Sequence, residues 1–180
     1  MGNRGQLHDD QRRIVRPFQV RRWIACELEF RGRRRRVMTP RRYTELFFVD
    51  EAVALSAGHR PCAECRRADY LRFRALWEAC HGRVSTVDAI DDVLHGERLD
   101  GRAKRTHRGR FDALPDGTFV AMDGDAWLVW RDELLAWSGH GYGARRARPR
   151  TGDVQLLTPP GIVAVLAAGY SPRLHPTAFE

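Results

Sequence analysis

Lysine is almost missing from this chain of 180 residues, in which Lys104 stands beside 30 arginines. A preference for arginine over lysine is common where the coding sequence is rich in G and C, so the choice of basic residue identifies no partner by itself. An internal repeat, a phosphate-binding P-loop and a dinucleotide-binding glycine fingerprint are all missing too. The sequence therefore gives no sign of a repeat protein or of the common nucleotide-binding folds.

Long apolar runs are also lacking. None approaches the roughly 18 residues that a membrane span needs, and the first residues contain no hydrophobic signal-peptide region. We therefore expect a cytoplasmic protein with no membrane partner. Thiols stay reduced in that compartment, so the four cysteines favour metal binding or core packing over disulfides. A hydrophobic content of 43% and a charged content of 30% are typical of a folded domain rather than a disordered chain.

Positive charge is what the chain does have, and it is unevenly distributed. The net charge is +8; residues 1–75 carry 18 arginines and 9 acidic residues, whereas residues 76–180 carry 13 basic and 14 acidic residues. Such clustering is typical of a surface that contacts a phosphate backbone. We therefore expect nucleic acid, DNA first, as the partner. The predicted phosphate-contacting residues are Arg33, Arg34, Arg35, Arg36, Arg41, Arg42, Arg66 and Arg67, with a second basic surface over 145–150.

The motif with the most chemical content is the pair Cys62 and Cys65, which follows Pro61 at the expected start of a helix. Two thiolates with this spacing lie about one turn apart, and the first-turn amides point at them, which makes half of a tetrahedral zinc site. The same spacing serves redox dithiols, and plain packing is a further alternative. We predict zinc as the cofactor.

The run from Glu45 to Cys65 (ELFFVDEAVALSAGHRPCAEC) resembles the metal-binding domain of the Ada DNA-repair protein. In that family an aromatic strand end leads to an Ala-rich helix and then to a Gly-aromatic-Arg-Pro-Cys-x-x-Cys turn. The similarity covers about residues 43–67. The resemblance implies that Cys62 and Cys65 are zinc ligands and that the module binds nucleic acid in DNA-damage recognition or repair.

The remaining zinc ligands are less well defined by the sequence. Ada-type modules supply two upstream ligands, whereas this chain offers only Cys26 there, so Cys26 is the predicted third ligand. Cys80 or His81 is the predicted fourth, although Cys80 stands about 22 Å beyond Cys65 along a straight helix. The histidines left open as ligands are His8, His59 and His107.

Two enzymatic alternatives follow from other residues. The Pro-Cys-x-x-Cys half of the nucleobase-deaminase signature is present, but the His-x-Glu half has only the near miss at residues 8–10. His107 lies within the basic stretch 101–110, where a histidine can act as a neutral base, so it is the candidate catalytic residue of a nuclease or glycosylase-like enzyme. A zinc-stabilised module that binds acidic proteins is the third alternative.

The pattern of apolar residues predicts an α+β fold. Helices are expected over 51–57 after the N-cap Asp50, from Pro61 to about Cys80 before Gly82, and over 85–99 with Thr86 or Ser85 as the cap. Apolar and polar residues alternate from Ile24 to Phe30, so a basic hairpin is expected over 24–38. A strand over 43–49 is also expected in the N-terminal half.

An antiparallel meander over 118–137 and a strand and short helix over 154–168 are expected in the C-terminal half, with a flexible basic loop over 139–150 between them. We predict a small zinc-binding α/β module over 1–82, a linking helix and basic loop over 83–109, and a β-rich half over 110–180.

Overall fold

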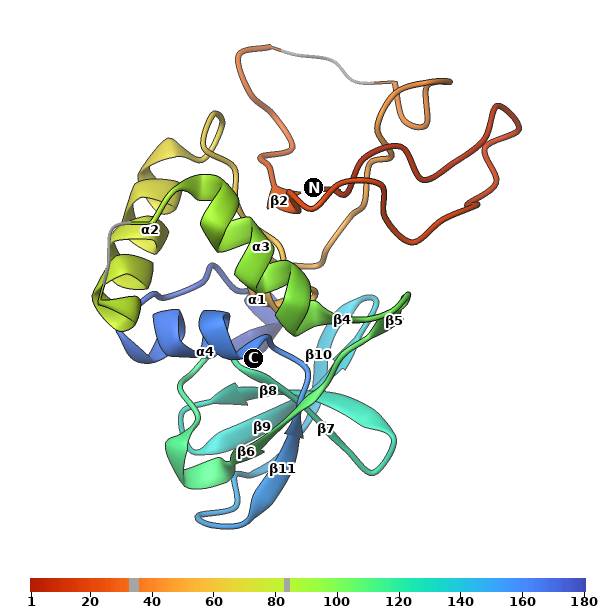
Figure 1. Ribbon diagram of the computed structural model, residues 1–180. Coiled ribbons are helices and arrows are strands. Elements are labelled where there is room, and N and C mark those ends of the chain that lie inside the picture. The colour runs from red at the N-terminus through yellow and green to blue at the C-terminus, as the bar shows by residue number, and fades with distance from the viewer. Residues whose placement is uncertain (33–35, 83–84) are drawn as a thin grey trace.

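The computed structural model describes residues 1–32, 36–82 and 85–180, and these residues form an α+β protein (Figure 1). The main sheet is antiparallel, with strand order β10-β9-β8-β7-β11-β6. Helices α1 to α4 lie on one side of it in Figure 1, and an N-terminal coil lies beyond them. The elements are β1 (Gly2–Asn3), β2 (Ile24–Ala25), α1 (Glu51–Ser56), β3 (Arg60–Pro61), α2 (Arg67–His81), α3 (Val87–Arg98), β4 (Leu99–Asp100), β5 (Ala103–Lys104), β6 (His107–Arg110), η1 (Phe111–Ala113), β7 (Phe119–Met122), β8 (Asp125–Trp130), β9 (Glu133–Ser138), β10 (Gly141–Ala147), β11 (Asp153–Leu156), α4 (Pro160–Ala167) and η2 (Pro176–Ala178).

Local signals set the ends of the helices as predicted, with one exception. The side chain of Asp50 caps α1 by accepting from the amide of Val53 at 2.9 Å, and Thr86 caps α3. Helix α2 ends at Gly82, which adopts the left-handed conformation with φ of 64°. The expectation that α2 begins at Pro61 is wrong: Pro61 belongs to the short strand β3, and a turn separates it from the helix.

The predicted meander is confirmed in β7, β8 and β9. Strands β7 and β8 are joined by Asp123 and Gly124, whose φ angles of 56° and 87° are both positive. This is the backbone that a two-residue hairpin requires for its strands to keep their right-handed twist. The basic loop expected over 139–150 is instead mostly strand β10, because residues 141–147 pair with β9 across a register irregularity.

The hairpin predicted over 24–38 is wrong in its described part. Only Ile24 and Ala25 form a strand there, and β2 pairs with β1 on one side and with β3 on the other rather than with a return strand. Residues 33–35, at its centre, lie outside the described residues. The strand expected over 43–49 is likewise reduced to an isolated bridge between Leu46 and Gly2.

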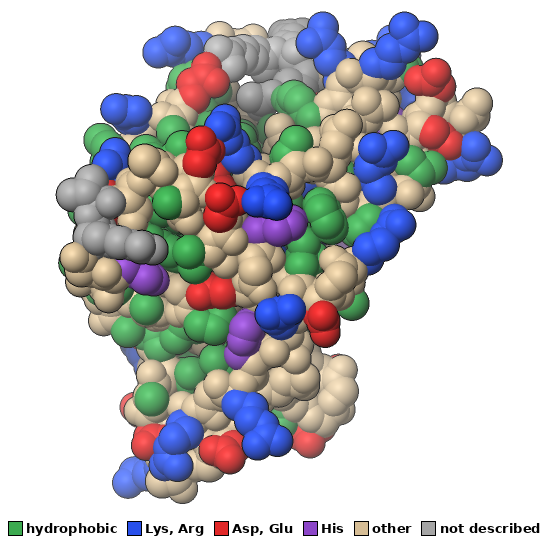
Figure 2. Space-filling view, viewed as in Figure 1, with side chains coloured by type: hydrophobic (Ala, Val, Ile, Leu, Met, Phe, Trp, Pro, Cys, Tyr) green, Lys and Arg blue, Asp and Glu red, His purple; other side chains and the backbone are tan. Residues whose placement is uncertain are grey.

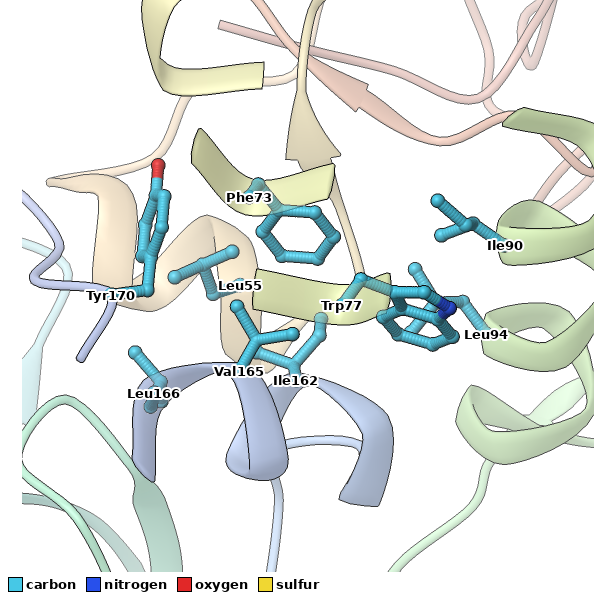
Figure 3. Packing of buried hydrophobic residues seen from close by; sticks show 9 residues of the cluster. All are labelled: Leu55, Phe73, Trp77, Ile90, Leu94, Ile162, Val165, Leu166 and Tyr170. Carbon is cyan, nitrogen blue, oxygen red and sulfur yellow. The ribbon is translucent and has the colours of Figure 1, made fainter. Parts of the chain in front are cut away.

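One apolar core joins all three predicted segments of the chain. Its buried members are Leu55, Phe73, Trp77, Ile90, Leu94, Ile162, Val165, Leu166 and Tyr170 (Figure 3). Helix α4, far along the chain, therefore packs against α2 and α3. Gly161 allows this approach, since a Cβ atom there would lie 2.6 Å from the indole of Trp77. The boundaries at 82 and 110 stay predictions, but the segments they separate share their interior.

We expect Asp50→Ala to lower the free energy of unfolding by about 2 kcal/mol, as the loss of a helix cap and of buried hydrogen bonds dictates. Besides capping α1, the carboxylate accepts from the hydroxyl of Tyr142 at 2.6 Å and from the amide of His175 at 3.1 Å. Urea denaturation is the measurement. Asp50→Asn keeps a capping oxygen and should recover part of the loss, whereas an alanine variant as stable as the wild type would contradict this assignment.

Candidate metal centre

Three of the four cysteines meet at one point. The sulfur atoms of Cys26, Cys62 and Cys65 all lie within 4.8 Å of one another. Cys62 is buried and the other two are half-buried. A tetrahedral zinc ion with Zn–S bonds of about 2.3 Å holds its sulfurs about 3.8 Å apart. The cluster therefore needs only a small contraction to accept such an ion.

The parallel pairing of β2 with β3 brings the cysteines together. Ile24 lies opposite Arg60 and Ala25 opposite Pro61, so the next residue along each strand is a cysteine. The amide of Cys62 donates to the carbonyl of Ala25 at 3.0 Å and fixes this register. Cys65 follows in the turn that leads into α2. The three thiols thus come from two segments that are far apart in the sequence.

Hydrogen bonds from backbone amides and between the thiols shift the pKa values of the three cysteines in different directions. The pKa of Cys62 is lowered to about 5, first by a hydrogen bond from Cys26 and then, against burial, by the amides of Cys65 and Glu64. The pKa of Cys26 is raised, first because its proton is held by Cys62 and then by burial. Burial also raises the pKa of Cys65. One thiolate is therefore stabilised before any ion binds, and a metal ion would have to displace the protons of the others.

Two groups of buried ion pairs hold in place the turn that carries Cys62 and Cys65, which we call the cysteine turn. Arg60, 3% exposed, donates two hydrogen bonds to the carboxylate of Asp91 in α3, at 2.9 and 2.7 Å. Arg66 donates to Glu51 in α1 and to Asp69, both at 2.6 Å. Sequence reasoning missed both anchors, although an arginine directly before the Pro-Cys step was a visible signal.

The fourth predicted cysteine does not join the cluster. Cys80 lies near the other end of α2, is exposed, and directs its thiol to the carbonyl of Ala164 at 3.4 Å. The choice of Cys80 as a ligand is therefore corrected: α2 continues unbroken from Arg67 to His81 and carries it away. His81 lies there too, with its Nδ1 at 2.8 Å from the carbonyl of Trp77. Among the described residues, no fourth His, Cys, Asp or Glu completes the group.

The other candidate histidines have structural contacts. His8 is buried, and its Nδ1 lies 2.6 Å from the hydroxyl of Thr44. His107 is half-buried in β6, where its Nε2 lies 2.6 Å from the carbonyl of Glu97. Its ring therefore joins the sheet to α3 rather than standing free in a loop.

His59 is the most enclosed of the histidines, with none of its surface exposed. Its ring contacts Trp23 and Phe48, and its Nε2 accepts from Arg4 at 3.2 Å. Burial, followed by the charges of Arg4 and Arg98, holds the pKa of His59 well below its usual range. The imidazole is therefore neutral in the folded protein at pH 7.

We expect the neutral state of His59 to make the protein less stable in acid. Below the usual pKa of about 6.5, His59 becomes protonated in the unfolded chain but stays neutral in the folded one. The free energy of unfolding should therefore fall by up to about 2 kcal/mol between pH 6.5 and pH 5. Chemical denaturation across this range should show a shallower loss for His59→Gln. Comparing the two proteins cancels the other titrating groups, and equal slopes would contradict the prediction.

The predicted phosphate-contacting arginines differ in their surroundings. Arg33, Arg34 and Arg35 lie outside the described residues. Arg66 is 6% exposed and paired with carboxylates, so it presents no free cation at the surface. Those that are exposed, and that form no ion pair within the described part of the chain, are Arg36, Arg41, Arg42 and Arg67. Figure 2 shows basic side chains along the rim of the N-terminal coil on the face in view.

A pocket of about 270 Å³ adjoins the cysteine cluster. Cys26 contributes to its wall together with Glu27 and Arg66, and residues of the C-terminal segment, including Arg173 and His175, line it as well. Sequence reasoning gave no signal for these last two residues. A metal ion held by three sulfurs would keep a fourth position for water or a ligand.

No family model, no curated protein and no solved structure matches this chain. None of the helices within the described residues is long and apolar enough to cross a membrane.

Proposed function

We propose that this protein binds one zinc ion through Cys26, Cys62 and Cys65, and that the metal-stabilised N-terminal half binds nucleic acid. The observation that carries the proposal is the convergence of three thiols within 4.8 Å from two distant segments. Thiolates are soft ligands, and a closely spaced set of them suits zinc over the hard cations Mg²⁺ and Ca²⁺. Water or a further ligand would occupy the fourth position.

The nucleic-acid part of the proposal is supported by charge and by the resemblance to the Ada module. Eight exposed arginines of the described N-terminal half form no ion pair with a described residue: Arg12, Arg16, Arg31, Arg36, Arg41, Arg42, Arg67 and Arg72. Other exposed arginines already have acidic partners, such as Arg21 with Asp92 at 2.9 Å. Because these cations form no ion pair within the described protein, none has to be broken when they contact phosphate, and this favours binding of a polyanion.

Filter binding to a DNA duplex over a range of salt concentrations tests this function. We expect log K to fall with log salt, and Arg41→Gln/Arg42→Gln to reduce the slope by about 2, since each lost phosphate contact removes about 0.9. The matched control is Arg108→Gln/Arg131→Gln, which removes two exposed arginines of the sheet region and should leave the slope unchanged. A flat salt dependence of the wild type would exclude the function.

The pocket beside Cys26 favours a second candidate, a metal-dependent enzyme acting on nucleic acid. A zinc ion with three protein ligands and one open position is the usual catalytic arrangement, in contrast to the closed structural site with four. The test is turnover of nicked, abasic or alkylated DNA by zinc-loaded and metal-free protein. Turnover that survives metal removal but is lost in His107→Ala would assign the chemistry to His107 instead.

A further inference from the structure

A second pocket, separate from the cysteine cluster, has a volume of about 320 Å³. It lies where the N-terminal coil, α1, the β4–β5 hairpin and the main sheet meet. No residue lines both this pocket and the one beside Cys26. Its volume is in the lower range of small-molecule sites in proteins. We call it the basic pocket because of the charges that line it.

Four cations line the basic pocket, and none of its described lining residues is acidic. The cations are Arg4, Arg98, Arg102 and Lys104. Arg98 is buried and Arg4 is half-buried, and cations so enclosed usually have a carboxylate partner. Here their environment differs from the rest of the described protein, where ion pairs are frequent.

The hydrogen bonds of these cations all go to neutral acceptors. Arg4 donates to the imidazole of His59, and the ammonium of Lys104 donates to the carbonyl of Ser56 at 2.8 Å. Arg98 is 1% exposed and donates to the carbonyl of Gly58 at 2.7 Å and to that of Arg21. The Nε of Arg98 is buried and has no partner within the described residues.

The cations also repel one another. Burial, and then the charge of Arg4 among others, lowers the pKa of Arg98 to about 9. Lys104 is exposed as a residue, but desolvation of its ammonium and then the charge of Arg4 lower its pKa to about 8. Asp91 is the acid that favours the charge of Arg98, and both of its oxygens already accept from Arg60. An anion in the pocket would relieve this repulsion.

The rest of the wall is apolar and partly aromatic. Trp23 is buried, with the guanidinium carbons of Arg4 and Arg98 at 3.9 and 4.0 Å from its ring centre. Trp137 also lines the pocket and keeps 39% of its surface exposed, and the buried ring of Phe119 contributes as well. Such a wall suits a flat ring.

We propose that the basic pocket binds a small aromatic anion, with its phosphate or carboxylate among Arg4, Arg98 and Lys104 and its ring against the wall that includes Trp137. The ligand class includes aromatic carboxylates and nucleotides, which share this chemistry. No residue of the cysteine cluster lines the pocket, so the ligand would make no contact with a metal ion held there.

Calorimetric titration of the full chain tests the proposal with two matched pairs of probes. The first pair is naphthalene-2-carboxylate and the neutral naphthalene-2-methanol; the second is adenosine 5′-monophosphate and adenosine. We expect at least one anion to bind at one site per chain and about tenfold more tightly than its neutral counterpart, as one charge-assisted contact provides. Preference for the first or the second anion tells a carboxylate ligand from a nucleotide. If neither anion binds better than its neutral counterpart, the proposal is overturned.

Two variants locate the binding. Lys104→Gln removes one cation of the pocket and should weaken the tighter anion about tenfold. The matched control is Arg105→Gln, which removes the next basic side chain along the hairpin, one that does not line the pocket. Its affinity should stay within about twofold of the wild type, as an exposed charge outside the contact allows. Equal affinities of Lys104→Gln and the wild type would overturn the proposal.

Discussion

Cys62→Ser is expected to abolish zinc retention. The wild-type protein, purified without chelator, should carry close to one zinc ion per chain, and the variant should carry close to none after the same dialysis. Cys62 is the central thiol, since its thiolate accepts hydrogen bonds from Cys26 and from the amide of Glu64. A serine hydroxyl is a poor zinc ligand at neutral pH, and two thiols alone do not make a structural site. Mass spectrometry of the metal content is the measurement.

Cys80→Ser is the matched control for that experiment. It makes the same change to a cysteine that is exposed and outside the cluster, so its zinc content should equal that of the wild type. Circular dichroism of Cys62→Ser, before and after zinc addition, shows whether the variant is folded and simply lacks a ligand. A wild-type protein that is free of metal, or a Cys62→Ser protein that retains it, would refute the metal centre.

Asp91→Ala is expected to lower the free energy of unfolding by about 3–5 kcal/mol, the usual result of leaving one partner of a buried ion pair alone. Asp91 is 1% exposed and accepts both hydrogen bonds that Arg60 donates to it from β3. Without it the guanidinium would remain buried beside the cysteine turn, with the carbonyl of Pro61 as its remaining acceptor within the described residues. Urea denaturation, with zinc in excess, is the measurement.

Two further proteins separate charge burial from simple loss of contacts. Arg60→Met/Asp91→Leu replaces both partners with apolar side chains of similar size and should recover much of the loss, because no unpaired charge is left. Asp92→Ala removes the neighbouring acid, whose pair with Arg21 is exposed, and should cost less than about 1 kcal/mol. If Asp91→Ala is no more damaging than Asp92→Ala, the pair does not anchor the turn.

Local signals in the sequence were sufficient for much of the regular structure. Asp50 and Thr86 as caps, Gly82 as a helix end and the Asp123–Gly124 turn act within a few residues, so they can be recognised without knowledge of the fold. The alternation of apolar residues between Ile24 and Phe30 failed as a guide. Of that stretch only Ile24 and Ala25 became strand, since β2 takes its partners from the start of the chain and from the segment before α2.

The candidate site could be predicted only in part, because contacts between segments that are distant in sequence leave no local pattern. Cys62 and Cys65 are close in sequence, so their spacing makes them candidates. Cys26 was predicted as the third ligand because it is the only upstream cysteine, and it does lie with them, although no local pattern encodes the parallel pairing that brings it there. Cys80 was a predicted ligand although a straight helix puts it about 22 Å from Cys65, and α2 is in fact unbroken from Arg67 to His81. The basic pocket was not predicted at all, because its cations come from the coil, α3 and the β4–β5 hairpin and meet only in the folded chain.

The parallel register of β2 and β3 has a consequence for the unfolded chain. An ion shared by Cys26 and Cys62 would tie the segment from Glu27 to Pro61 into a ring. In that segment the described residues ahead of α1 form no strand or helix beyond the bridge at Leu46. A covalent cross-link around a ring of this size removes chain entropy worth about 4 kcal/mol. An ion that leaves on unfolding does not hold this ring closed in the denatured chain; the native fold has to close it, and the free energy of metal binding offsets that entropy cost.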